Sequence, residues 1–150
     1  MSIFQDHNFN LIPHLVALTI AYVLALPIGW NREKAHRAAG LRTFPLVAMA
    51  SCGIVEAAES LTMDNPEAMA RIVEGIITGM GFIGGGAILR TQGNVSGTAT
   101  AASLWATGAM GMAVGLSSYD VAVIISIITF ATFWLFVPIK NQLEGEKKDL

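Results

Sequence analysis

Charge is scarce in this chain. Only 13% of its 150 residues are Asp, Glu, Lys or Arg, whereas a soluble domain usually carries about 25%. Hydrophobic residues make up 53%, and they come in long blocks rather than at the spacing of an amphipathic helix or strand. Blocks of about 17 to 25 apolar residues are long enough to cross a bilayer. The composition therefore predicts one compact integral membrane unit without a second soluble domain.

Other features are also missing, and each absence excludes a class of function. The single cysteine, Cys52, excludes an internal disulfide and a cysteine-rich metal site. No basic stripe suggests a nucleic-acid partner. Ser, His and Asp do not stand at spacings that suggest a catalytic triad, and the few histidines are expected in tails or loops. We therefore expect neither an enzyme nor a bound cofactor.

The apolar blocks predict an all-α bundle of about five transmembrane helices. Strands of a membrane barrel would alternate with period two, and no such alternation is present. Residues 1–10 contain no Lys or Arg, which a cleaved signal peptide would need, so the first span is expected to be retained. Residues 1–138 form the predicted membrane domain, and 139–150 a short cytoplasmic tail. The expected helices cover residues 11–30, 41–61, 71–89, 97–115 and 121–137, the last ended by Pro138.

The basic residues predict the orientation. Five crossings place eight of the nine Lys and Arg residues on one side of the bilayer and leave Arg71 alone on the other. Because basic loops stay in the cytoplasm, the N-terminus is predicted outside and the C-terminus inside. Trp30 and Trp134 fall near cytoplasmic ends, as interfacial aromatic residues do. Trp105 lies deeper in its helix and is expected to be a packing residue.

Three acidic residues are predicted inside the membrane. Counted from Arg42, Glu56 and Glu59 lie about 21 and 26 Å along their helix, and Glu74 lies about 24 Å from Arg90. These counts place all three near one depth below the outer face. One interpretation is an outward-facing site that attracts a cation such as Mg²⁺. The alternatives are glutamates in the headgroups or water, and a structural Glu–Arg pair with Arg71.

Small residues dominate the third and fourth predicted helices. Gly75 and Gly79 form a GxxxG pair, a spacing that lets two helix backbones approach closely. The run from Gly84 to Gly86 either unwinds the helix toward a cavity or serves close packing. In the fourth helix a small polar stripe is predicted either to pack tightly or to line a path for water. Its members are Thr100, Ser103, Thr107, Gly111 and Gly115.

The polar segment 31–43 is predicted to be a cytoplasmic loop. It contains Arg32, Glu33, Gly40 and Arg42. It acts either as a topology determinant that touches anionic headgroups or as a docking surface for a partner. Arg90 is expected at the same level of the membrane.

Three ordered motifs resemble those of the MgtC/SapB family of membrane proteins. The segments 28–33 and 39–43 resemble its first signature, 79–89 its second, which contains Gly79, Gly81 and Gly84 to Gly86, and 95–105 its third. Together they span about residues 25–115. The chain departs from the family at Asn31, where the family usually has Glu beside the arginine.

The resemblance implies a bacterial inner-membrane protein linked to growth in low magnesium and, in pathogens, to virulence. It also implies the short form of the family, without a cytosolic C-terminal domain. Family members look more like regulators than pumps, and restraint of the membrane ATP synthase is attributed to some. We therefore expect a regulator that contacts a membrane partner, such as ATP synthase, or a second copy of itself. The alternative is a Mg²⁺ or proton conduit that uses the outward-facing carboxylates.

Overall fold

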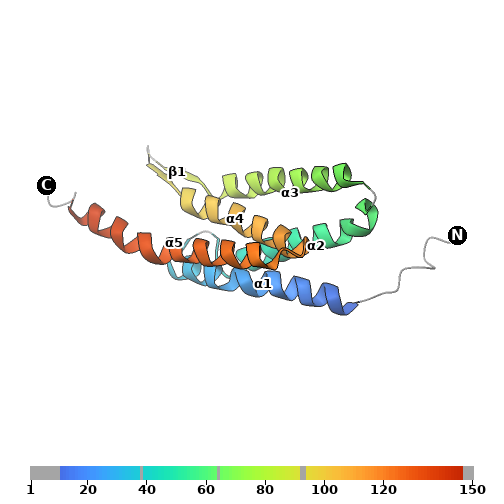
Figure 1. Ribbon diagram of the computed structural model, residues 1–150. Coiled ribbons are helices and arrows are strands. Elements are labelled where there is room, and N and C mark those ends of the chain that lie inside the picture. The colour runs from blue at the N-terminus through green and yellow to red at the C-terminus, as the bar shows by residue number, and fades with distance from the viewer. Residues whose placement is uncertain (1–10, 38, 64, 92–93, 147–150) are drawn as a thin grey trace.

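The computed structural model describes residues 11–37, 39–63, 65–91 and 94–146, and within them it is an all-helical bundle with one small hairpin (Figure 1). Successive helices run in alternating directions, so that α1 begins at one end of the bundle and α5 ends at the other. The elements are α1 (Leu11–Lys34), α2 (Thr43–Thr62), α3 (Pro66–Gly86), β1 (Leu89–Thr91), β2 (Asn94–Ser96), α4 (Thr98–Gly115) and α5 (Tyr119–Glu146). The predicted fold class and the five helices are confirmed.

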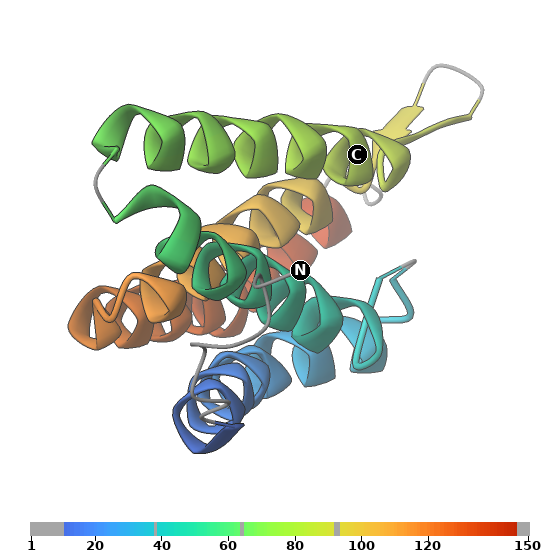
Figure 2. The same ribbon diagram turned by 90° about the vertical axis from the view of Figure 1, so that its right-hand side faces the viewer.

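Helix α4 is the centre of the bundle and contacts all four other helices. In Figure 2, α3 lies along one side of the molecule and α1 along the other, with α4 between them. On α1 the buried face is made of Ala17, Ala21, Ala25 and Ile28, which recur at the spacing of one helix face. Because three of these side chains are single methyl groups, α1 can approach its neighbours closely.

The outside of the bundle is apolar, as a lipid-facing surface requires. Long side chains such as Val23 and Ile127 are exposed on α1 and α5, and a soluble monomer rarely shows so much apolar surface. Three helices of the described chain, α1, α3 and the Tyr119–Phe136 part of α5, are long and apolar enough to cross a membrane. Helices α2 and α4 are not among these three. The fold is a helical membrane bundle.

Two helices extend beyond their predicted ends. Helix α1 continues past Trp30 to Lys34, so that Arg32 lies in its last turn rather than in a loop. Helix α5 does not stop at Pro138 but runs to Glu146. A proline removes one N–H donor and crowds the preceding turn, yet membrane helices often accommodate it. The prediction that Pro138 ends the helix is wrong.

Helix α3 begins five residues and ends three residues earlier than predicted, and a hairpin follows it. Asn65 caps its start, because its side-chain oxygen accepts a hydrogen bond from the N–H of Ala68 at 3.2 Å, and Pro66 occupies the first turn. The helix ends at Gly86 rather than Leu89. The next residues form the antiparallel pair β1–β2, in which Arg90 faces Val95. No motif predicted these two three-residue strands.

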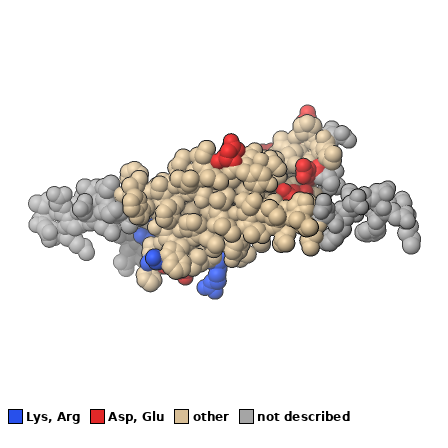
Figure 3. Space-filling view, turned by 60° about the horizontal axis from the view of Figure 1, so that its bottom comes forward, with Lys and Arg blue, Asp and Glu red and all other residues tan. Residues whose placement is uncertain are grey.

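Charge is divided along the bundle, as the sequence predicted. On the face drawn in Figure 3 the basic side chains lie in one half, and most acidic ones lie toward the opposite end. Three of the exposed basic residues, Lys34, Arg37 and Arg42, belong to the end where α1 meets α2. Basic and acidic side chains are therefore separated along the length of the bundle.

Candidate functional site

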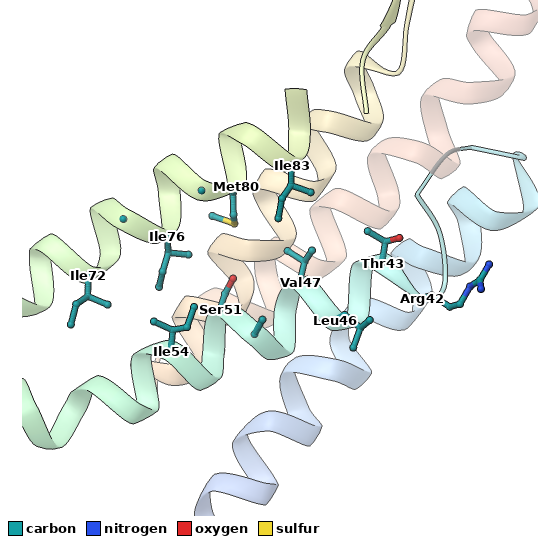
Figure 4. A pocket seen from close by; sticks show the side chains of 13 residues that line it. Arg42, Thr43, Leu46, Val47, Ser51, Ile54, Ile72, Ile76, Met80 and Ile83 are labelled. Atoms are coloured by element: carbon teal, nitrogen blue, oxygen red, sulfur yellow. The ribbon is translucent and has the colours of Figure 1, made fainter. Parts of the chain in front are cut away.

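An open groove runs between α2 and α3 (Figure 4). Its volume is about 720 Å³ and its lining is almost entirely apolar, with Ser51 in the middle and Arg42 at one end. The larger apolar side chains that line it are Leu46, Val47, Ile54, Ile72, Ile76, Met80 and Ile83. A groove of this size and character suits an apolar occupant such as a helix or lipid chains.

Most glycines of α3 have open space next to their Cα atoms. Gly75 and Gly79 line the groove, and a methyl group added to either would meet nothing within 4 Å. The same holds for Gly81, Gly85 and Gly86, which do not line the groove. Only Gly84 of this series packs inside the chain, because a methyl group added there would lie 3.4 Å from the carbonyl oxygen of Ala101. Helix α3 remains helical through Gly86, so of the two alternatives for the glycine run, unwinding toward a cavity is wrong.

The glycines of α4, in contrast, are all used in packing within the bundle. A methyl group at Gly108 would collide with the side chain of Met80, and one at Gly111 with the backbone of Ala48. At Gly115 it would lie 2.8 Å from Cβ of Val55. These contacts let α4 press directly against α2 and α3, as small residues do in membrane helices.

The three hydroxyl residues of the predicted stripe on α4 are buried, and two of them bond within their own helix. Thr100, Ser103 and Thr107 are all buried. Ser103 donates to the carbonyl oxygen of Thr100 and Thr107 to that of Ser103, each at 2.8 Å. Such bonds to the preceding turn satisfy the hydroxyl donors without water. The stripe therefore supports tight helix packing rather than a water-lined path.

Trp105 is not the packing residue that its depth predicted. Its side chain is 48% exposed on α4. A count along the helix does not give the direction of the side chain, which depends on where the other helices lie. An exposed indole on a membrane helix contacts lipid or another protein.

The three predicted carboxylates have different environments. Glu56 bonds to His14 of α1, with 2.5 Å between its Oε2 and Nδ1 of the histidine. His14 thus lies in a helix rather than in a tail or loop, and sequence reasoning missed this pairing. Glu59 is exposed and lines a separate pocket of about 430 Å³ beside Ser117. Glu74 is exposed on α3.

These carboxylates do not form a metal site. Among the described residues no three His, Cys, Asp or Glu side chains lie close enough together to hold a metal ion. Within the same residues the one ion pair is His14–Glu56, so Arg71 does not neutralise Glu74 there. Magnesium needs an octahedral set of oxygen ligands, and we derive no magnesium site from this geometry.

The segment between α1 and α2 is tied down by Glu33. Its Oε2 accepts a hydrogen bond from the N–H of Leu41 at 3.1 Å. A methyl group at Gly40 would collide with this carboxylate, so the glycine makes room for it. Arg42 and Arg90 are exposed. Glu33 and Gly40 therefore hold the shape of the segment, while the two arginines remain available to headgroups or a partner.

Arg32 is buried, although the sequence placed it in an aqueous loop. It is 3% exposed, and its guanidinium carbon lies 3.4 Å from the ring centroid of Phe133 in α5. One of its terminal nitrogens donates to Oδ1 of Asn31 at 2.5 Å. The contact with Phe133 depends on how α5 packs against α1, and no local pattern in the sequence signals it.

Comparison with known proteins agrees with these motifs. The model of the MgtC family matches residues 18–142. Protein MgtC of Salmonella typhimurium strain LT2 is 36% identical over 151 residues, which cover 96% of this chain and 64% of that protein. Protein SrpB of Synechococcus elongatus is 35% identical, covering 77% of this chain and 70% of that protein.

A third relative carries a name that refers to magnesium. The putative magnesium transporter YhiD of Escherichia coli K12 is 33% identical, covering 91% of this chain and 66% of that protein. No solved structure matches the chain. The chain spans just under two thirds of the length of the Salmonella typhimurium protein. Because the family model matches most of its length, the chain belongs to the MgtC family of membrane proteins.

Proposed function

We propose that this protein is a regulator in the bacterial inner membrane that acts through helix contacts in the groove between α2 and α3. The proposal includes the predicted orientation, with the N-terminus outside and the C-terminus in the cytoplasm. The observation that carries it is the contrast between two helices. The glycines at 108, 111 and 115 of α4 are filled by neighbours, whereas Gly75 and Gly79 of α3 face open space.

The groove fits a transmembrane helix as its occupant. Two glycines on one wall and Ala50 and Ser51 on the other leave room for a helix backbone to approach both α2 and α3. In a bilayer such close packing and interhelical hydrogen bonds drive association. The partner is a second copy of this chain or another membrane protein, for which ATP synthase is the candidate that the family resemblance offers.

The biological setting that we propose is adaptation to low magnesium and, in a pathogen, virulence. The name of the Escherichia coli relative supports the link to magnesium. The magnesium role is then regulatory rather than that of a bound ion, because the described carboxylates do not gather into a ligand set.

Gly79→Leu is expected to abolish the helix contact while leaving the fold intact. A leucine at this position fills the groove, where an added Cβ meets nothing within 4 Å. Recovery of the partner from native membranes, or of the dimer by cross-linking, should fall at least about tenfold, which corresponds to about 1.4 kcal/mol. Growth in low magnesium should be impaired in parallel.

Gly81→Leu is the matched control. It makes the same change two residues along the same helix, also in open space, but away from the groove. We expect Gly81→Leu to recover as much of the partner as the wild type does. If Gly79→Leu keeps both the complexes and the growth phenotype, helix contact in the groove is excluded, and lipid chains are its occupant.

A cation conduit remains the second candidate. Glu59 lines a pocket at the end of the bundle that contains most of the acidic residues, and the name of one relative refers to transport. On this reading, replacing Glu56, Glu59 and Glu74 by Gln should abolish Mg²⁺ or proton flux in reconstituted vesicles. We expect no such flux in the wild type, because the hydroxyls of Ser103 and Thr107 on α4 already donate to carbonyl oxygens of the same helix. Flux that depends on the three glutamates would reverse the ranking.

A further inference from the structure

Arg32 is a buried cation without a counter-charge in the described chain. The residue is 3% exposed, and its Nε is buried without a hydrogen-bond partner. Its hydrogen bond to Asn31 and its contact with the Phe133 ring are both to uncharged groups. Removing a charge from water is costly unless the charge is paired. The arrangement is therefore incomplete, and an anion would complete it.

The start of α4 contributes a second source of positive potential at the same place. Its N-cap is Gly97, which has no side chain to bond the free N–H groups of the first turn, and that turn contains no acidic residue. The first N–H groups of a helix have no partner within it, and they attract anions together with the helix dipole. In an 18-residue helix this effect is fully developed.

A pocket of about 250 Å³ joins these two features. Arg32 and Phe133 form part of its wall, and the start of α4 with Thr98 forms another part. Arg37, Ser96, Thr100 and Thr132 complete the polar lining. Two guanidinium groups, four hydroxyl side chains and a helix N-terminus thus surround one small space. No acidic residue in the described part of the chain lines it.

We propose that this pocket binds a single phosphate group. The planar guanidinium presents parallel N–H donors that match phosphate oxygens, and hydroxyls with backbone N–H groups supply the remaining hydrogen bonds. The pocket lies below the range of about 300 to 1,000 Å³ in which larger ligands bind, so it suits one phosphate rather than a nucleotide. This site is separate from the groove of the proposed function, and either can fail without the other.

The phosphate has two sources. Trp134 and Trp30, both exposed, stand close in sequence to Phe133 and Arg32, and such residues mark the level of the headgroups. An anionic lipid headgroup can therefore reach the pocket from the bilayer. Inorganic phosphate can reach it from the water, because Arg37 is exposed.

The experiment uses the full chain in two arms. In the first, protein in a maltoside detergent is titrated with inorganic phosphate, and binding is followed by calorimetry and thermal unfolding. In the second, the protein is placed in nanodiscs of an uncharged lipid with or without phosphatidic acid, and unfolding is compared. Binding in the first arm identifies free phosphate, and stabilisation in the second arm alone identifies a headgroup.

Asn31→Glu tests the role of the unpaired charge. It places a carboxylate where the amide now meets Arg32, so the protein supplies its own anion. Affinity for phosphate, or stabilisation by phosphatidic acid, should fall at least tenfold. Arg37→Gln removes an exposed charge with little risk to folding and should weaken binding severalfold. Arg71→Gln removes the same charge from α3 at the other end of the bundle and should bind as wild type.

Three results would overturn the proposal. They are no effect of phosphate in either arm, unchanged binding in both Asn31→Glu and Arg37→Gln, and equal loss in Arg71→Gln. The last would mean attraction by net charge alone. If Asn31→Glu does not fold, the comparison of Arg37→Gln with Arg71→Gln decides between the proposal and its failure.

Discussion

Gly111→Ala is expected to destabilise the protein by about 3 kcal/mol, the upper part of the usual range for an overpacked core. Its added methyl group would overlap the carbonyl oxygen of Ala48, which belongs to the backbone of α2. A backbone atom cannot rotate away, so α2 or α4 must shift as a whole. Because α4 contacts every other helix, such a shift disturbs the entire bundle. Unfolding in detergent, followed by circular dichroism against temperature or denaturant, measures the loss.

Gly108→Ala is the control for this prediction, three residues earlier on α4. There the added methyl group meets the flexible side chain of Met80 rather than a backbone. An unbranched thioether can change rotamer to make room. We therefore expect Gly108→Ala to reduce the stability of the protein by less than about 1 kcal/mol. Equal destabilisation by the two variants would show that the backbone contact between α2 and α4 is not the determinant.

The central role of α4 could be predicted only in part from the sequence. Thr100, Ser103 and Thr107 follow helical spacing with Gly111 and Gly115, which identifies one small face. The spacing cannot say whether that face meets a helix of the same chain, a partner or water. The structure decides this, because all five residues are buried inside the bundle.

The glycines of α3 also show that spacing alone does not identify what a small helix face contacts. Gly75 and Gly79 carry the same signal for close packing as the glycines of α4, yet their face is open. A local motif encodes the possibility of a close approach and not its partner. The partner depends on the arrangement of all five helices, which is a tertiary property.

Contacts between residues far apart in the sequence could not be predicted from it. His14 and Glu56 are 42 positions apart, and Arg32 meets Phe133 from another helix. Counting along single helices places Glu56 and Glu74 along their helix axes, but it carries no information on rotation about the axis. The predicted convergence of the carboxylates assumed a shared direction that the packing does not impose.

The two sites proposed for this protein rest on different kinds of incomplete structure. The groove between α2 and α3 lacks packing atoms, whereas the pocket beside Arg32 lacks a counter-charge. Missing packing atoms call for an apolar helix or lipid, and a missing counter-charge calls for an anion. The junction between the hairpin and α4 is the element on which the second site depends, since it positions the first turn of α4.

Gly97→Ala is expected to disrupt that junction and to cost about 3 kcal/mol of stability. Gly97 has a φ of 88°, a conformation that costs a residue with a side chain about 1 to 3 kcal/mol. In addition, its Cβ would collide with the carbonyl oxygen of Ala87. Unfolding in detergent measures the stability, and phosphate titration should show weaker binding because the first turn of α4 is displaced.

Gly85→Ala provides the comparison for Gly97→Ala. Gly85 lies in the last turn of α3, where an added methyl group meets nothing within 4 Å. Alanine favours a helix over glycine by up to about 1 kcal/mol, so this variant should be neutral or slightly more stable and should bind phosphate normally. If both variants behave alike, the left-handed turn at Gly97 does not hold the hairpin against α4. If Gly97→Ala loses stability but keeps phosphate affinity, the start of α4 is not part of the anion site, and the binding must come from the two arginines alone.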